Sequence, residues 1–304
     1  MLKNIVASIL LISFLFIAFS STSCKRNRDE IDDIPEENTV KTNKPVINED
    51  QINEIISSFS SPVEMAALMN SFEVPFSKKY IADPAVTEDY DTNVKKALAL
   101  GILSADLGYL NVYERSSLIV EYLSAIKRIS DDLRVSQFFN FQSLKRLATS
   151  KDNIDSLLFL SVQSFQGMDS HLRSSGRSNL SLLVITGVWL EGLYLLTQVA
   201  KENKNQKLIE RIGEQKILFN LLYPIYKIYI DDPYFAKLVD EFKEFQNIFE
   251  KINITYQQGD PETKIIDGRV TVIQHDMSIV EISDTQLEQI TKTTEKIRNK
   301  LLNQ

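Results

Sequence analysis

Two stretches of this chain are apolar on nearly every side, and each contains a single charged residue. Residues 97–113, ALALGILSADLGYLNVY, have Asp106 as their only charge, and residues 180–200, LSLLVITGVWLEGLYLLTQVA, have Glu191. A helix that is apolar all round is typical of the centre of a large domain or of a membrane span. An acid near the middle of a span costs about 2.5–3.5 kcal/mol on insertion scales. We therefore expect two central helices of a helical domain, with a membrane span at 180–200 as the alternative.

Both acids should then be buried or line a cavity. A buried charge without a partner is costly, so each acid must be paired, hydrogen-bonded or protonated. Each has a tyrosine three residues further on, on the same helical face, and His171 and Arg173 are further candidate partners. One interpretation is a polar network that fixes the register of the helices. Another is a pocket for a small ligand, formed by Asp106, Tyr109, Tyr113, Trp189, Glu191 and Tyr194.

Helical patterns with short connections fill most of the remaining chain and predict antiparallel neighbours. Ser61 and Glu64, with Pro62 between them, predict the start of a helix that runs to about Ser71. The aromatic side chains of residues 223–235 recur at helical spacing, which predicts core packing and not an exposed stacking surface. The other helices are expected at 114–133, 138–149, 153–173, 205–230 and 233–252.

The pattern changes near the C-terminus. Asp267 and Gly268 suit the tight turn of a β-hairpin between 263–266 and 269–274. Ser283 and Gln286 predict the capped start of a last helix, which should dock through Leu287, Ile290, Thr294, Ile297 and Leu301. The predicted fold class is all-α, an irregular antiparallel multi-helix bundle with a small C-terminal β-hairpin and a final helix. We divide it into a helical domain, 49–256, and a segment, 257–304, that packs on it.

Composition and motifs argue against several classes of function. The formal net charge is −7, which is opposite to the clustered cations that a nucleic-acid partner requires. The two histidines, His171 and His275, lie in different regions, the chain contains a single cysteine, and no HExxH motif is present. We therefore predict no metal site and no cofactor. No GxSxG or GxGxxG motif occurs, so no known catalytic constellation is recognised and we expect no enzymatic activity.

The N-terminus has the layout of a secretory signal. Lys3 precedes an apolar stretch, residues 5–19, that is shorter than the roughly 20 residues a membrane span needs. The single cysteine, Cys24, has no partner within the chain, so it must pair outside it, stay reactive or be modified. A permanent N-terminal anchor helix is the alternative to a cleaved signal. Residues 24–48 are polar and charged with no aromatic residue, as expected of a disordered tether.

The small residues Ser21, Thr22 and Ser23 before Cys24 resemble the lipobox of bacterial lipoproteins. The resemblance implies that residues 1–23 are removed and that Cys24 carries acyl chains such as palmitate, which would hold the protein to a membrane. The stretches LSADLGY and VWLEGLYLLTQVA are similar in texture to uncharacterised all-helical lipoproteins of Bacteroidota, which brings no known activity. Lys25, where an aspartate would favour the inner membrane, implies the outer membrane. Three cations before Asp29 imply a periplasm-facing protein, with cell-surface display as the alternative.

Three functions remain open. The first is a lipid-anchored, non-catalytic envelope protein that binds a protein partner or supports an envelope assembly. The second is a small-ligand-binding lipoprotein with a cavity between the two apolar helices. The third is a hydrolase that uses Asp106 and Glu191 as paired acids. A closed core with both acids hydrogen-bonded would favour the first function, whereas an open pocket lined by the aromatic candidates would favour the second.

Overall fold

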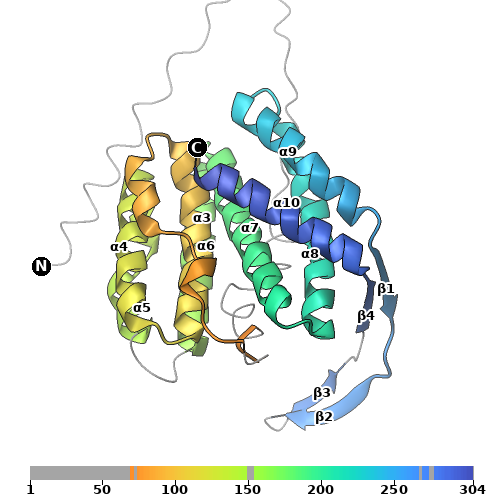
Figure 1. Ribbon diagram of the computed structural model, residues 1–304. Coiled ribbons are helices and arrows are strands. Elements are labelled where there is room, and N and C mark those ends of the chain that lie inside the picture. The colour runs from red at the N-terminus through yellow and green to blue at the C-terminus, as the bar shows by residue number, and fades with distance from the viewer. Residues whose placement is uncertain (1–68, 72–73, 149–153, 267–268, 274–276, 304) are drawn as a thin grey trace, which may run out of the picture. The chain divides into compact units, whose positions relative to one another are not determined.

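Eight α-helices make up most of the part of the chain that the structure describes (Figure 1). The computed structural model describes residues 69–71, 74–148, 154–266, 269–273 and 277–303, which all belong to one unit of the chain, 44–304. The predicted signal peptide, Cys24, the tether and the helix start at Ser61 lie outside the described residues. Of that first predicted helix, residues 69–71 are described, and they are helical.

The helices follow the predicted order, and their ends differ from the predicted ones by a few residues. Two short 3₁₀ turns, η1 (Lys78–Tyr80) and η2 (Pro84–Asp89), precede α3, and a third, η3 (Ser136–Phe138), lies between α4 and α5. The helices are α3 (Asn93–Val112), α4 (Ser116–Asp132), α5 (Phe141–Ala148), α6 (Ile154–Ser174), α7 (Ser178–Glu202), α8 (Gln206–Ile228), α9 (Pro233–Phe249) and α10 (Asp284–Leu302).

The two apolar helices, α3 and α7, pack against each other at the centre of this part of the chain. A Cβ atom added to Gly101 would lie 2.1 Å from the backbone oxygen of Val184, and one added to Gly187 would lie 2.2 Å from that of Leu98. No side chain fits at such distances, so the two backbones approach directly at these glycines. The crossing therefore requires glycine at both positions, and it brings together the residues that follow each glycine.

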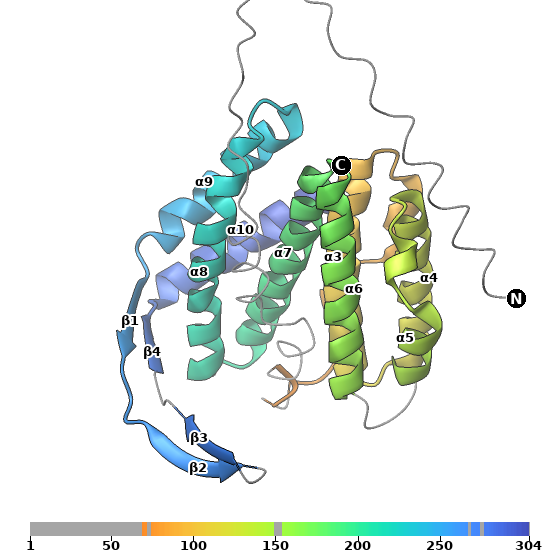
Figure 2. The same cartoon turned by 180° about the vertical axis from the view of Figure 1, so that it is seen from behind.

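The other helices cover the central pair on both sides. Helices α4, α5 and α6 form one group, with α4 against α3 and α6 against α7, whereas α8, α9 and α10 form the other group. Helix α10 crosses in front of α7 in Figure 1, and in the opposite view of Figure 2 α10 lies behind α7 while α6 runs beside it. Helix α7 is thus enclosed, and its residues from Leu180 to Ala200 are all buried.

This enclosure bears on the alternative of a membrane span. Within the described residues, α7 is the one helix long and apolar enough to cross a membrane, and its apolar stretch is entirely buried inside the protein. Because neighbouring helices occupy all of its faces, none is left for lipid. The prediction of a central core helix at 180–200 is confirmed.

Local signals set the ends of several helices. The side chain of Thr92 accepts a hydrogen bond from the backbone N–H of Lys95 at the start of α3. Asp232 caps α9, whose first residue is Pro233. Ser283 and Gln286 form the predicted capping box of α10. Such caps satisfy backbone N–H groups that have no partner in the first turn of a helix, which explains why these boundaries could be predicted.

Four strands follow α9 as two antiparallel pairs. The predicted hairpin is confirmed: β2 (Glu262–Ile266) pairs with β3 (Arg269–Ile273), with Ile266 opposite Arg269. A second pair, β1 (Asn253–Gln257) and β4 (Met277–Glu281), was not predicted. In the sequence, β1 and β4 lie on either side of the hairpin. The β-structure therefore begins at Asn253, within the range 49–256 that was predicted to form the helical domain.

Of the aromatic residues predicted to be core, Tyr223, Tyr226 and Phe235 are buried, and Tyr229 and Tyr234 are partly buried and pack against the same core. Tyr226 and Phe235 are fully buried, and the hydroxyl groups of Tyr226 and Thr186 are 2.8 Å apart. The buried stripe of α10 also agrees with the prediction, since Leu287, Ile290, Thr294, Ile297 and Leu301 are all buried. Helix α10 therefore docks on α7 and α9 through the face that its sequence indicates.

Candidate functional site

Asp106 of α3 and Glu191 of α7 are neighbours in the interior, and both side chains are completely buried. Each lies roughly one helical turn beyond the glycine at which the two helices cross. The close backbone approach at Gly101 and Gly187 thus places two acids side by side in the core. Such an arrangement is unfavourable unless a cation or a proton compensates the charge.

The cation is Arg298 of α10, which the sequence analysis did not identify. Its Nη2 donates to Oε1 of Glu191 at 2.6 Å, and its Nε donates to Oε2 at 2.8 Å. Such a two-point contact between a guanidinium and a carboxylate is short, directional and stronger than a neutral hydrogen bond. It ties the last helix of the chain to the central one.

Two further contacts hold the guanidinium of Arg298. Its carbon atom lies 4.3 Å from the ring centre of Tyr194, and the cation stacks on the ring face. Its Nη2 also lies 3.5 Å from the backbone oxygen of Tyr80. The predicted proximity of Glu191 and Tyr194 is therefore real, but the arginine mediates it.

Asp106 is held from the segment that precedes α3. Its Oδ2 accepts a hydrogen bond of 2.9 Å from the backbone N–H of Ala82, and the backbone oxygen of Ala82 accepts one from the hydroxyl of Tyr122 in α4. No donor among the described residues lies against Oδ1 of Asp106. This oxygen is the one that can carry a proton and donate it towards the neighbouring carboxylate.

Burial, and then the negative charge of Glu191, raise the pKa of Asp106 well above its ordinary value, and Arg298 and the N–H of Ala82 oppose the rise only in part. Both causes favour the neutral form of Asp106 over its carboxylate. A protonated Asp106 beside the ion pair of Glu191 and Arg298 gives three side chains with no net charge. We call Asp106, Glu191 and Arg298 the buried acid–arginine network.

The buried acid–arginine network has no visible route for a substrate. All three side chains are buried, and none of them lines the cavity beside Leu100 and Phe165 or the surface pocket beside Glu244 and Lys292. A general acid or a nucleophile must reach its substrate within hydrogen-bonding distance. The arrangement is instead suited to fixing α3, α7, α10 and the segment around Ala82 in one register.

Tyr109 and Tyr113 belong to a different cluster. Their rings lie 4.7 Å apart and pack on Phe76. The hydroxyl of Tyr109 accepts from the backbone N–H of Ser77 at 3.1 Å, and that of Tyr113 donates to the backbone oxygen of Val74 at 2.8 Å. Burial raises the pKa of Tyr109 to about 12. These two phenols anchor the segment before α3 and do not form a pocket with the acids.

Trp189 lies in a third environment. It packs against Phe219, Phe242 and Phe245, with ring centres 5.3–5.9 Å apart. The pocket in which all six predicted residues meet is therefore not formed: the acids and Tyr194 join Arg298, while the other three stabilise separate parts of the core. Trp189 is two residues before Glu191 and therefore lies on a different face of α7.

His171 and Arg173 do not reach the acids either. Arg173 forms an ion pair with Asp169 at 2.8 Å, and His171 packs against the ring of Phe138. Among the described residues, no group of three or more side chains of the metal-binding types could hold an ion.

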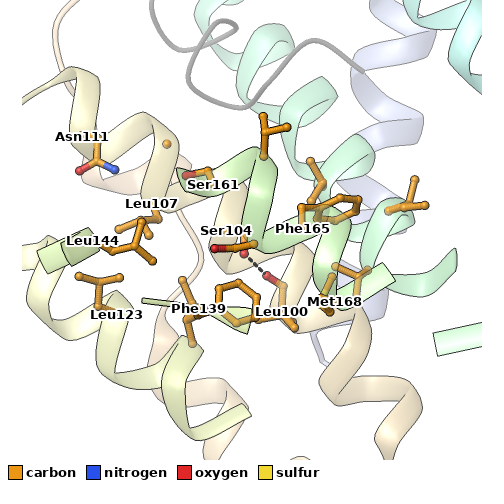
Figure 3. A pocket seen from close by; sticks show the side chains of 17 residues that line it. Leu100, Ser104, Leu107, Asn111, Leu123, Phe139, Leu144, Ser161, Phe165 and Met168 are labelled. Carbon is orange, nitrogen blue, oxygen red and sulfur yellow. Dashed lines mark hydrogen bonds between the residues drawn. The ribbon is translucent and has the colours of Figure 1, made fainter. Parts of the chain in front are cut away.

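A cavity does exist beside the two central helices, on the side away from α10. Its volume is about 150 Å³, and it lies among α3, α4, α5, α6 and α7 (Figure 3). Most of the lining is apolar, including Leu107, Leu123, Phe139, Leu144, Phe165 and Met168. Ser104, Ser161 and Asn111 are polar members of the lining. The sequence analysis named none of these residues.

One signal could have pointed to Arg298. Two acids in apolar helices require a compensating group, and Arg298 lies four residues after Thr294, which belongs to the predicted docking stripe of the last helix. The cavity had no comparable signal, because it depends on how well five helices fill the space between them.

Comparison of the chain with protein-family models, with curated proteins and with solved structures finds no match.

Proposed function

We propose that this chain is a non-catalytic, lipid-anchored envelope protein that binds a protein partner or supports an envelope assembly. The buried acid–arginine network carries this proposal. Asp106 and Glu191 are the acids that the sequence offered for catalysis, and both are enclosed and engaged with Arg298, Ala82 and each other. Their role is to hold the fold, so the function is assigned to binding.

The anchor in this proposal is a lipid on Cys24, and the membrane is the outer one, with the protein facing the periplasm. The small residues before the cysteine and the cations after it support this placement. Two or more acyl chains hold a protein stably to a membrane without a spanning helix. Display on the cell surface is the alternative, and protease treatment of intact cells distinguishes the two orientations.

The anchor is tested by mass spectrometry of the N-terminal peptide of the purified native protein. We expect the mature chain to begin at Cys24 and to contain fatty acid on that residue. A Cys24→Ser variant should leave the membrane fraction. A mature chain that begins elsewhere, or a cysteine free of fatty acid, would remove the anchor from the proposal.

The binding role is tested by crosslinking in intact cells and recovery of the lipidated chain. We expect one protein to be recovered with the wild type and to be lost with Cys24→Ser, because the released chain no longer meets a partner at the membrane. An unrelated lipoprotein expressed at the same level controls for proximity alone. If both lipoproteins recover the same set of proteins, the partner proposal fails.

The cavity favours a second candidate, a lipoprotein that binds a small ligand. A site of this kind is concave and mostly apolar, with few polar groups, which describes the space beside Ser104, Asn111 and Phe165. The hydrolase is disfavoured by comparison, since its two proposed acids do not line this cavity.

A further inference from the structure

The cavity is apolar over most of its wall and lies where five helices meet. Leu100 and Leu107 line it from α3, Leu123 from α4, Leu144 from α5, Met168 from α6 and Val188 from α7. Figure 3 shows these helices around one space, with Phe139 and Phe165 among the side chains that line it. Apolar side chains enclose the space on several sides, which favours an apolar occupant over water.

The size of the cavity sets the size of the occupant. Its volume is about 150 Å³, and a cavity of about that volume with an apolar lining admits a benzene-sized molecule. Val162, which lines the cavity, is 39 % exposed, and Phe159, three residues earlier on the same helix face, is 61 % exposed. The cavity therefore reaches the surface beside α6, and a small molecule has a route into it.

Asn111 gives the cavity a polar end. Its side-chain oxygen, Oδ1, is buried, and no hydrogen-bond donor lies within reach of it in the described part of the chain. Figure 3 shows the carboxamide at the end of the cavity near Leu107 and Leu144. A buried acceptor without a donor is costly, and a ligand that supplies the donor removes that cost.

Ser104 does not supply this donor. Its hydroxyl group donates to the backbone oxygen of Leu100 at 2.6 Å, one helical turn back. The hydroxyl proton of Ser104 is therefore already used in a hydrogen bond within α3. Oδ1 of Asn111 can still accept a hydrogen bond from a molecule in the cavity.

We infer that the cavity binds a small apolar molecule, a single aromatic ring or a short hydrocarbon, that has one hydroxyl group and donates its proton to Asn111. This inference rests on the second candidate function and specifies its ligand class. The ring or chain fills the space between α3 and α6, and the hydroxyl satisfies Oδ1 of Asn111. A ligand with a negative charge does not fit, because none of the described residues that line the cavity is a cation.

The test compares phenol with toluene, which match in size and differ in the hydroxyl group. Isothermal titration uses the full chain with Cys24→Ser, so that no attached lipid competes for the cavity. We expect phenol to bind roughly tenfold more tightly than toluene, as one net hydrogen bond predicts. In Asn111→Leu, which keeps the volume similar and removes the acceptor, the two ligands should bind equally.

A pair of serine variants locates the binding. Ser104→Leu fills the cavity and should abolish the binding of both ligands. Ser124→Leu is the matched control, because Ser124 makes the same hydrogen bond to the residue one turn back, Val120, on an exposed face of α4. It should leave both affinities unchanged. Melting temperatures of all variants show that each is folded.

The outcomes separate the ligand class from the site itself. Equal affinity of wild type for phenol and toluene, with both lost in Ser104→Leu, overturns the hydroxyl class and leaves a small-ligand site. No binding of either molecule to wild type, or binding that Ser104→Leu does not reduce, overturns the site and with it the second candidate function. Should Asn111→Leu not fold, the comparison in wild type still decides the class.

Discussion

Replacing Arg298 by methionine should destabilise the protein by about 4 kcal/mol at pH 7. Methionine preserves most of the side-chain volume and removes the cation, so Glu191 loses both hydrogen bonds to Arg298, at 2.6 and 2.8 Å. Glu191 is fully buried and already adjoins Asp106. Breaking a buried ion pair on one side costs about 3–5 kcal/mol.

A second route gives the same magnitude. A buried carboxyl that has lost its cation can avoid a buried charge by taking up a proton, which at pH 7 costs about 1.4 kcal/mol for each unit above the ordinary glutamate pKa of about 4.3. For a glutamate, this cost of protonation is about 4 kcal/mol at pH 7 and about 1 kcal/mol at pH 5. A carboxyl whose folded pKa is raised contributes its full stability below the unfolded pKa and loses it as the pH rises. The cost of Arg298→Met should therefore shrink as the pH falls.

The assay is urea unfolding followed by the fluorescence of Trp189, the only tryptophan, which is buried among phenylalanines. Lys201→Met is the matched control, because Lys201 and Glu295 form an ion pair between the same two helices at a half-exposed position. Its cost should stay below about 1 kcal/mol at both pH values. The reasoning is refuted if Arg298→Met costs less than about 1 kcal/mol at pH 7, or costs the same at pH 5.

Three further predictions concern other parts of the structure. Asp106→Asn should be at least as stable as wild type at pH 8 and should lack the loss of stability that wild type shows as pH rises above about 4, because the amide imitates the neutral acid; urea titrations across pH measure this. Gly101→Ala should lower the free energy of unfolding by about 1–3 kcal/mol or more, since its Cβ would lie 2.1 Å from a backbone oxygen in α7. Ser283→Ala should cost about 0.5–2 kcal/mol, because α10 loses its capping box, and should speed amide exchange in the first turn.

Each of the three has a control or a contrary outcome. For Asp106→Asn, a steeper dependence on pH than in wild type would contradict a neutral Asp106. For Gly101→Ala, the control is Gly167→Ala, whose Cβ would meet only the movable ring of Phe138 at 2.9 Å; equal costs would argue against the glycine crossing. For Ser283→Ala, unchanged exchange at Gln286, whose N–H the serine accepts, would show that the cap does not matter.

Most of the fold follows from local patterns in the sequence. Helix starts at Asp232 and Ser283 are set by caps that depend on residues within one turn. The hairpin of β2 and β3 follows from the Asp-Gly pair in the sequence between its strands, and the buried face of α10 from an apolar spacing of three and four. The outer strand pair was missed because β1 and β4 are 19 residues apart and no turn joins them directly.

The site divides in the same way. Sequence alone determined that Asp106 and Glu191 would be buried, because no other charge occurs in the apolar stretches 97–113 and 180–200, and that each would need a partner. Only the tertiary structure decided that Glu191 pairs with Arg298, 107 residues further on, and that Asp106 lies beside this pair. It also decided that Tyr109, Tyr113 and Trp189 pack in other parts of the core. The physical reason is that burial depends on the composition of one helix, whereas the choice of partner depends on the crossings of three. The cavity is likewise a property of five packed helices and of none of them separately.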